Sequence, residues 1–385
     1  MRLIIRIKIY RSISEIDESR WDAIVGKDRI LCSYKYIEIM EKAGINKDRC
    51  YYPVVYDGDQ IVAHTSVYLM TAGLDLFAQG LLKKIIHFIR RGLKSFFILR
   101  YFECGPPAEV GSLVSLKDGA DKVKIMRVLC DGIEGLGKKL GVKFFVFRDF
   151  YDEEKEFHDI FTRYGYTKTH NLPKAELKIT WKSFNNYLNS MRSNYRCKIV
   201  KSMKKCADAN VSIQVLREFS SYSHELKELY DNVSSRAKEI KREPFAEAFF
   251  QNINNYLKDK SILLLAVKDS KPIGFALLLV NDKTFLVTLI GLDYAQHQQS
   301  YTYFNLFYKT IELAIENGMD KIDMGITTLD PKRDMGSGIL ALNMYMKHSN
   351  PILNKIIPLL FDTITPPDTT APRNVFKEAV DIEKK

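Results

Sequence analysis

Three ionisable side chains stand close together in the sequence, where they could assist the acylation of an amine. Asp323 falls near the end of a predicted strand, Lys321–Gly325, and Lys332 and Arg333 follow that strand. Acylation of an amine needs a polarised carbonyl and a route for the amine proton. Lys332 or Arg333 could stabilise a tetrahedral oxyanion or hold an acidic substrate group, and Asp323 could act as general base or substrate anchor. The alternatives are an exposed charged loop and a turn cap.

Three further side chains lie just before, or at the start of, the helix predicted at Tyr301–Asn317. His297 could move a proton at neutral pH, because imidazole titrates in that range. The phenol of Tyr301 or Tyr303 could protonate a leaving thiolate. Each has an alternative, since a loop histidine can be incidental and a tyrosine ring often serves for packing. The predicted catalytic residues are Asp323, Lys332, Tyr301 and His297.

The elements that must position these side chains are a strand, a polar segment and a helix. Phe285–Leu292 has the pattern of a hairpin strand, Asp293–Ser300 is polar, and Gly318 ends the helix that follows. A strand that leads through a loop to a helix N-terminus offers backbone N–H groups and a helix dipole to anionic or carbonyl oxygens. We therefore expect this segment to bind the phosphate or thioester of a donor. The predicted donor contacts are Leu292, Asp293, Tyr294, Ser300, Tyr303 and Asn305.

A basic stripe marks the helix predicted at Ser183–Ala209. Its members are Arg196, Lys198, Lys201, Lys204 and Lys205. The stripe could meet a phosphate-bearing donor or acceptor, or it could be a solvated helix face. The predicted substrate-binding residues are Arg196, Lys198 and Arg333.

One supersecondary pattern occurs twice in the chain. Tyr52–Met70 has the pattern of a hairpin with an Asp-Gly turn, and Ala266–Val280 has the same pattern with its own turn. A helix at Val123–Leu140 then leads to a strand at Phe144–Phe147, just as the helix before Gly318 leads to a closing strand. Two copies predict a tandem α+β protein, and chance similarity between two α/β halves is the alternative.

Composition and charge narrow the classes of protein. The chain has 385 residues, a net charge of +11 and a pI of about 9.1. These values favour a membrane surface, a nucleotide or tRNA as partner, with a solvated basic surface as the alternative. Six cysteines without a Cys-x-x-Cys pair predict no metal site, no disulfide framework and a reducing cytosolic compartment. Met1–Tyr10 lacks the features of a signal peptide, and no apolar run reaches the ~20 residues of a spanning helix.

One segment has the pattern of a helix that lies on a membrane. On a helical wheel of Leu81–Phe97, nine apolar residues occupy one half, while the other half carries five Lys or Arg and no acid. Surface helices of globular domains normally mix both signs of charge. We therefore predict contact with an anionic membrane surface, with packing on the protein's own core or on a partner as the alternative.

The second half resembles the FemAB-like branch of the GNAT superfamily in the order of its motifs. These motifs are Asn194-Tyr195-Arg196-Cys197-Lys198-Ile199 with Lys204-Lys205 and Ala209-Asn210-Val211, the aromatic pair Phe249-Phe250, Asp323-Met324-Gly325, and Lys332-Arg333-Asp334-Met335-Gly336. The first half is similar to the bacterial subgroup of peptidoglycan biosynthesis or recognition proteins. Its matching residues are Trp21-Asp22, the Asp57-Gly58 hairpin, Gly105-Pro106 and Phe147–Phe150. The resemblance implies two GNAT-like domains, each a mixed, mostly antiparallel sheet flanked by helices.

The expected domains follow from the repeat and the resemblance. They are an N-terminal GNAT-like domain at 1–172 with an amphipathic insertion at 74–100, a C-terminal FemAB-like acyltransferase domain at 173–362, and a flexible tail at 363–385. Within the second domain, Leu340–His348 is predicted to be helical.

The resemblance implies a transferase with acyl-CoA as co-substrate and no permanently bound cofactor. One departure is that Tyr294–Ser300 has no glycine, whereas GNAT enzymes use glycines there to wrap pyrophosphate. We expect an N-acyltransferase that moves an acyl group to an amine of a lipid or cell-envelope precursor, in the cytoplasm at the inner face of the membrane. Two alternatives stay open. One is an aminoacyltransferase that uses aminoacyl-tRNA on a peptidoglycan precursor, and the other is a non-catalytic glycolipid-recognition module.

Overall fold

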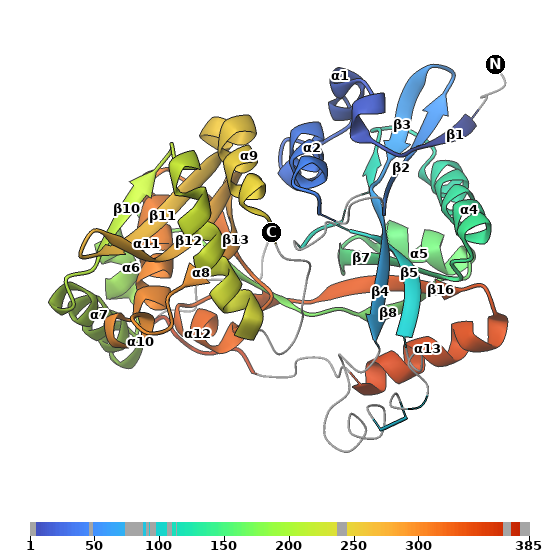
Figure 1. Ribbon diagram of the computed structural model, residues 1–385. Coiled ribbons are helices and arrows are strands. Elements are labelled where there is room, and N and C mark those ends of the chain that lie inside the picture. The colour runs from blue at the N-terminus through green and yellow to red at the C-terminus, as the bar shows by residue number, and fades with distance from the viewer. Residues whose placement is uncertain are drawn as a thin grey trace. The chain divides into compact units, whose positions relative to one another are not determined.

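The computed structural model describes residues 5–45, 49–73, 88–89, 92, 98–105, 110–112, 114–236, 245–364 and 371–377 (Figure 1). Contacts divide the chain into two compact units. Unit 1 comprises Met1–Leu172 and Ala341–Asp368, and unit 2 comprises Pro173–Ala237, Pro244–Leu340 and Thr369–Lys385, each in its described part.

The sheet of unit 1 has nine strands within the described ranges. They are β1 (Ile5–Tyr10), β2 (Cys50–Asp57), β3 (Gln60–His64), β4 (Val67–Gly73), β5 (Ile98–Cys104), β6 (Ser115–Leu116), β7 (Phe144–Tyr151), β8 (Thr167–His170) and β16 (Leu342–His348). Eight follow the order β6-β3-β2-β4-β5-β7-β16-β8, and β1 pairs with β2. All neighbours are antiparallel except β5 and β7, which are parallel.

Helices cover both faces of this sheet. They are α1 (Glu18–Asp22), α2 (Tyr34–Lys42), α4 (Lys122–Leu140), α5 (Lys155–Arg163) and α13 (Pro351–Ile364). Because successive strand residues point to opposite faces, Phe145 and Phe147 join the core beneath α4 and α5, while Phe144 and Val146 join a smaller cluster closed by Ile357 of α13. Gly141 ends α4 with a left-handed backbone (φ 71°), as its sequence position predicts.

The sheet of unit 2 has the order β10-β11-β12-β13-β14-β9-β15. Its strands are β9 (Lys174–Lys178), β10 (Ser212–Leu216), β11 (Ser261–Lys268), β12 (Lys271–Asn281), β13 (Thr284–Leu292), β14 (Lys321–Gly325) and β15 (Gly338–Leu340). Its helices are α6 (Phe184–Ser190), α7 (Ser193–Asp208), α8 (Ser223–Arg236), α9 (Glu247–Leu257), α10 (His297–Ser300), α11 (Thr302–Glu316) and α12 (Leu329–Asp334). The pair β13 and β14 is parallel, and the other neighbours are antiparallel.

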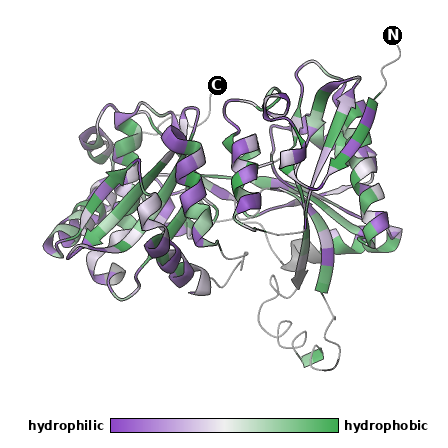
Figure 2. Ribbon diagram, turned by 45° about the horizontal axis from the view of Figure 1, so that its top comes forward, coloured by the Kyte–Doolittle hydropathy of each residue, from purple (hydrophilic) through white to green (hydrophobic). Residues whose placement is uncertain are grey.

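Adjacent residues of β12 show which helices cover which face. A Cβ on Gly274 would lie 2.8 Å from the Thr302 side chain, so the start of α11 approaches the sheet where no side chain intervenes. The next residue, Phe275, points to the opposite face, where its ring lies 5.8 Å from that of Phe250 in α9. These two contacts place α11 on one face of the sheet and α9 on the other. Apolar residues concentrate along the central strands between them (Figure 2).

Both units are therefore mixed, mostly antiparallel sheets flanked by helices, and the predicted tandem α+β fold is confirmed. In each unit, a strand is followed along the chain by a helix and then by a second strand that pairs in parallel with the first, and an antiparallel hairpin precedes the three. The three elements are β5, α4 and β7 in unit 1, and β13, α11 and β14 in unit 2. No helix in the described ranges has both the length and the apolar character needed to cross a bilayer.

The predicted domain 173–362 needs a correction, because the chain returns to unit 1 after β15. Residues 342–348 form strand β16 between β7 and β8, not a helix. Their burial explains the difference, since Met344 and Met346 face one side of the sheet and Tyr345 faces the other, which is the period of a strand. Unit 1 accordingly includes Ala341–Asp368.

The predicted tail 363–385 also needs a correction within its described part. Residues 371–377 pack on unit 2, where Val375 is buried and Phe376 forms a β-bridge with Met191. The predicted amphipathic helix Leu81–Phe97 lies outside the described residues except for Phe88, Ile89 and Gly92.

Candidate functional site

The parallel strands β13 and β14 pair only at their first residues and then separate. Their register covers Thr284↔Lys321, Phe285↔Ile322 and Leu286↔Asp323, whereas β13 stays paired with β12 up to Leu292. The register of β12 with β13 shifts at Thr288, whose hydroxyl donates to the Leu277 carbonyl at 3.0 Å. The carboxyl ends of separating parallel strands are a usual place for a ligand in α/β proteins. We call this place the divergence of unit 2.

Lys332 brings its amine to the divergence from α12. A Cβ on Gly325, at the end of β14, would lie 3.9 Å from the Lys332 Nζ and 3.9 Å from the Val287 carbonyl oxygen of β13. Lys332 is 3 % exposed, donates to the Thr327 carbonyl at 2.5 Å, and lies 5.8 Å from the Phe307 ring centre. Burial lowers the pKa of Lys332 to about 8, and the negative charge of Asp323 partly opposes that shift. In the described part of the chain no carboxylate forms an ion pair with this amine.

Asp323 lies at the same end of β14 and is already bonded on both oxygens. It accepts from the Lys174 Nζ at 2.8 Å and from the Gly325 N–H at 2.9 Å. A carboxylate held by two hydrogen bonds is better suited to act as a fixed negative charge or as a substrate anchor than as a general base. Lys174 was not predicted from the sequence, because β9 meets β14 only through the sheet.

Tyr303 and Phe307 extend the site from α11, where they share one helix face. Their ring centres lie 5.1 Å apart. Burial raises the pKa of Tyr303, and the nearby Thr328 hydroxyl opposes the shift, so the phenol keeps its proton at neutral pH. The structure thus brings Asp323, Lys332 and Tyr303 to one end of the parallel pair.

The predicted donor segment is more folded than an open loop. The N–H groups of Asp293, Ala295, Gln296 and Ser300 all donate to oxygens of this chain, at 2.8–3.3 Å. Residues 297–300 form α10, and Tyr301 joins it to α11 with a left-handed backbone (φ 52°). Several of the backbone N–H groups that were predicted to bind a ligand are therefore bonded within the chain. The N–H groups at the start of α11 are the main ones left for that role.

The side chains of the predicted donor contacts have mostly internal partners. Leu292 is in the core, Arg236 lies 4.0 Å from the Tyr294 ring, and the Ser300 hydroxyl lies 2.6 Å from that of Thr302. Asn305 is buried and donates to the Ser202 carbonyl at 3.2 Å, which ties α11 to α7. These contacts give the four residues structural roles.

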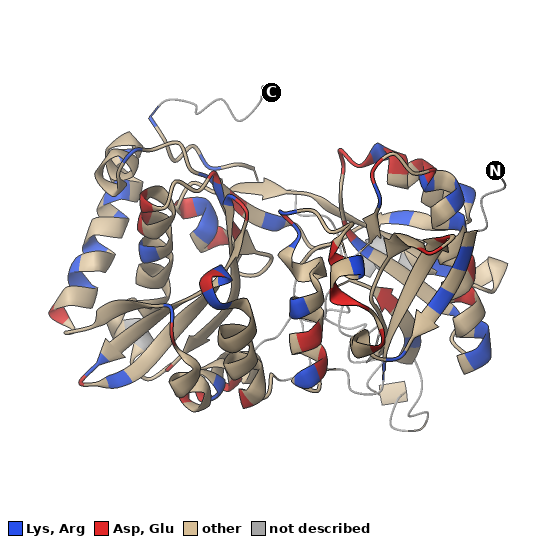
Figure 3. Cartoon of the chain, turned by 90° about the horizontal axis from the view of Figure 1, so that it is seen from above, with Lys and Arg blue, Asp and Glu red and all other residues tan. Residues whose placement is uncertain are grey.

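The remaining predicted residues lie on α7, on α12 and in the segment from α10 to the start of α11. Tyr301 accepts from the Lys205 Nζ at 3.1 Å. Lys198 is exposed and pairs with Asp334 at 3.1 Å, Arg196 is half-buried on α7, and Arg333 is buried 3.4 Å from Asp330. Basic residues follow one another along α7 with little acid between them (Figure 3). The side chain of His297 lies outside the described part.

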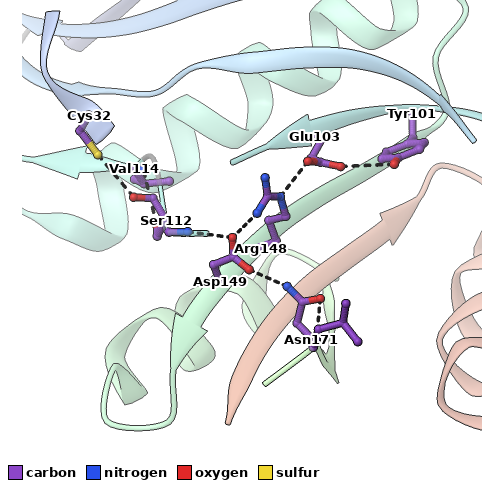
Figure 4. Close-up of polar contacts among 10 residues, drawn as sticks. Cys32, Tyr101, Glu103, Ser112, Val114, Arg148, Asp149 and Asn171 are labelled. Carbon is purple, nitrogen blue, oxygen red and sulfur yellow. Dashed lines mark hydrogen bonds and ion pairs between the residues drawn. The ribbon is translucent and has the colours of Figure 1, made fainter. Parts of the chain in front are cut away.

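Unit 1 contains a second divergence, and charged side chains of the chain itself fill it. Strands β5 and β7 pair up to Cys104↔Phe147. Directly beyond, the Arg148 guanidinium pairs with Glu103 at 2.7 Å and with Asp149 (Figure 4). Asp149 has a positive φ of 69° and accepts from the Gly111 N–H and the Asn171 amide at 2.9 and 2.6 Å. This network was not predicted from the sequence, because its only local signal is the pair Arg148-Asp149 within an apolar strand.

The same position thus differs chemically between the units. In unit 1 a guanidinium is neutralised by two carboxylates, whereas in unit 2 a buried amine meets a backbone carbonyl. In the described ranges no group of three or more His, Cys, Asp or Glu side chains could hold a metal ion. The divergence of unit 2 is therefore the better candidate for acyl-transfer chemistry.

Comparison with known proteins identifies the family. The model of the FemAB-like family, described as peptidoglycan biosynthesis/recognition, matches residues 12–332. This chain belongs to the FemAB-like family.

Individual relatives are distant. A Mycobacterium tuberculosis protein named "Putative 8-amino-7-oxononanoate synthase 2" is 23% identical over 324 residues, which are 82% of this chain and 42% of that protein. The FemAB-like chain thus spans less than half the length of this curated relative. The structure named FemX has a TM-score of 0.55 at 12% identity and covers 91% of this chain and all of its own. The C-terminal domain (DUF2156) of a "Putative Lysylphosphatidylglycerol Synthetase" from Agrobacterium fabrum has a TM-score of 0.54 at 12% identity, with 92% and 97% covered.

These likenesses show that the FemAB-like chain shares its fold with FemX and with the lysylphosphatidylglycerol synthetase domain. The residues that perform the chemistry stay predictions.

Proposed function

We propose that this FemAB-like protein is an N-acyltransferase that moves an acyl group from a coenzyme A thioester to an amine of a lipid or cell-envelope precursor. The observation that carries the proposal is the buried Lys332 amine where β13 and β14 separate. At its pKa of about 8 this amine is mostly protonated at pH 7. A cation withdrawn from water stabilises a developing oxyanion far better than an exposed one.

The proposed reaction uses two side chains of the divergence. The neutral acceptor amine attacks the carbonyl carbon of the donor and forms a carbon–nitrogen bond, and the carbonyl oxygen becomes an oxyanion that accepts a hydrogen bond from Lys332. When the carbon–sulfur bond breaks, the thiolate takes a proton from Tyr303. The proton lost by the acceptor nitrogen restores the phenol, so that the products are an amide and a free thiol. The negative charge of Asp323 lies near the Lys332 amine and favours its protonated form.

The names of the relatives support an acceptor in the cell envelope. The description of the family names peptidoglycan biosynthesis/recognition, and the name of one structural neighbour contains a lipid, lysylphosphatidylglycerol. Both descriptions support an acceptor in the cell envelope.

A second donor, aminoacyl-tRNA, is favoured by two specific observations. The N–H groups of the segment that would wrap pyrophosphate are largely used within the chain. The basic stripe of α7 adjoins the start of α11 through the Lys205–Tyr301 hydrogen bond, where it could meet a polyanion. An aminoacyl ester would be attacked in the same way, with a ribose oxygen as leaving group.

The test is transfer to amine-bearing lipids and peptidoglycan precursors, with acyl-CoA and aminoacyl-tRNA offered separately and products identified by mass spectrometry. Lys332→Met should lower the rate at least about tenfold. Lys271→Ala, which removes an exposed lysine of β12, is the matched control and should leave the rate unchanged. Retention of the wild-type rate in Lys332→Met would exclude the mechanism. Glycolipid binding without transfer from either donor would instead indicate a recognition module.

We also propose that the protein associates with anionic membranes, and a described helix supports this. The outward face of α13 carries four exposed apolar residues at helical spacing, Ile352, Leu353, Ile356 and Leu359, and the same helix carries the exposed Lys355. An exposed apolar stripe with a basic residue beside it suits an anionic bilayer interface.

Flotation with phosphatidylglycerol vesicles tests this association. The triple variant Ile352→Ser, Ile356→Ser and Leu359→Ser should float less than wild type, whereas Val123→Ser, an exposed apolar position of α4, should float equally. Equal flotation of all three proteins, or a wild-type dimer that the triple variant abolishes, would contradict the proposal.

A further inference from the structure

A short C-terminal segment, Ala371–Lys377, is fixed to unit 2, and we call it the strap. The Arg192 N–H donates to the Val375 carbonyl and the Lys377 N–H donates to the Ser190 carbonyl, both at 2.8 Å. These bonds flank the β-bridge between Met191 and Phe376, so the strap adds a strand-like segment to the junction of α6 and α7.

Arg373 connects the strap to both ends of α12. Its guanidinium donates to the Asp330 carbonyl at 3.0 Å and pairs with the Asp330 carboxylate at 2.8 Å. The same guanidinium pairs with Asp334. Asp330 lies in the first turn of α12 and Asp334 is its last residue, so one side chain spans the helix that carries Lys332.

Phe376 fixes the chain directly after α12. A Cβ on Gly336 would lie 2.3 Å from the Phe376 ring, and Gly336 has a φ of +91°, so only glycine fits beneath the ring without strain. The ring also lies 5.1 Å from the Trp181 ring. The Tyr187 hydroxyl donates to the Met335 carbonyl at 2.9 Å, which holds the residue before Gly336.

A helix of six residues cannot maintain its own orientation, because so short a helix is unstable in isolation. No side-chain cap helps at its N-terminus, where Thr328 has a left-handed backbone. Contacts with the rest of unit 2 must therefore fix the direction of α12, and the strap supplies them at both ends.

We infer that the strap is a positioning element for Lys332: Arg373 and Phe376 hold α12 so that the Lys332 amine stays buried where β13 and β14 separate. Arg373 and Phe376 touch no reacting atom in this account. The consequence for catalysis rests on the proposed function, whereas the consequence for the burial of Lys332 does not.

The first test needs no activity. Folded protein is treated briefly with acetic anhydride, and the acetylation rate of each lysine is followed by mass spectrometry. Arg373→Ala, Phe376→Ala and a chain that ends at Ile364 should each label Lys332 roughly tenfold faster than wild type, because local opening exposes the amine. Lys271, which is exposed already, should label equally in all of them. Arg127→Ala, which removes an exposed arginine paired with Asp131 in unit 1, is the matched control.

The second test uses the transferase reaction. The strap variants should lower kcat about tenfold with little change in KM, and Arg373→Lys should recover part of the loss. The fall in rate at high pH should also move to higher pH, because an amine in contact with water regains its ordinary pKa. A role confined to global stability would leave the pH profile unmoved.

The outcomes separate the two proposals. Unchanged Lys332 labelling in all three strap variants, with native circular dichroism, would overturn the strap inference whatever the activity. Faster labelling with no transferase activity in wild type would support the strap inference and contradict the proposed function. Variants that unfold entirely would also overturn the inference, because the strap would then be part of the core.

Discussion

Replacing Lys332 with methionine should stabilise unit 2 at pH 7 while lowering its transfer rate at least about tenfold. Methionine has nearly the length of lysine and can keep the contact with the Phe307 ring. Asp323 loses no bonded partner, since Lys174 and the Gly325 N–H remain. The substitution therefore removes a buried charge without leaving another charge unpaired.

The magnitude follows from the pKa of Lys332, which falls from 10.5 to about 8 on burial. A pKa lowered this far corresponds to a cost of about 3 kcal/mol for keeping the amine charged in the folded state at pH 7. The Thr327 carbonyl loses its donor in the variant, which costs about 1–2 kcal/mol. The expected net gain in unfolding free energy is about 1–2 kcal/mol.

The sign of the pH dependence separates this explanation from a packing effect. Between pH 8 and 10.5 the unfolded wild-type chain binds a proton that the folded chain has released, so wild-type stability rises with pH there. The advantage of Lys332→Met should therefore shrink by about 1 kcal/mol between pH 7 and pH 9.

Urea unfolding measures both quantities. The chain has two tryptophans, Trp21 in unit 1 and Trp181 in unit 2, so fluorescence in a Trp21→Phe background reports unit 2 alone. Both proteins are compared in that background at pH 7 and pH 9. A variant less stable than its parent at both pH values, or a stability difference that does not change with pH, would refute the reasoning.

Three further predictions follow from other contacts. Tyr303→Phe should lower the transfer rate by about 10²-fold while leaving donor binding unchanged, which steady-state kinetics measures. Glu103→Gln should destabilise unit 1 by about 2–3 kcal/mol in urea unfolding, because the buried Arg148 loses a charged partner. If tRNA is the donor, Lys201→Glu with Lys204→Glu should weaken its binding and flatten the dependence of binding on salt, whereas acyl-CoA binding should not change.

The local elements of the fold could be predicted from the sequence, because turns and helix ends have local causes. Gly141 and Gly318 end α4 and α11, and the Asp-Gly and Asp-Ser turns close hairpins as expected. The return of β16 to unit 1 could not be predicted, because it depends on pairing with β7, about 200 residues earlier. Its alternating Met and Tyr residues also fit a helical pattern, because both faces of the strand are apolar.

The candidate site was predictable only where its parts are near in sequence. Asp323 and Lys332 lie nine positions apart and meet at one strand end. Lys174 is 149 positions from Asp323 and reaches it only through the sheet. The polar residues before α11 suggested a ligand, but Ser300 and Asn305 bond to this chain instead. Sequence alone cannot show which polar groups are already satisfied.

The most direct test of the central claim is the ratio of wild-type to Lys332→Arg kcat/KM between pH 6 and 10. Arginine keeps its charge over this range, and taking the ratio cancels the ionisation of donor and acceptor. If the charged Lys332 amine stabilises the oxyanion, the ratio should be constant at low pH and fall about tenfold per pH unit above its pKa of about 8. A ratio that stays constant, or that rises through pH 8, would contradict the account.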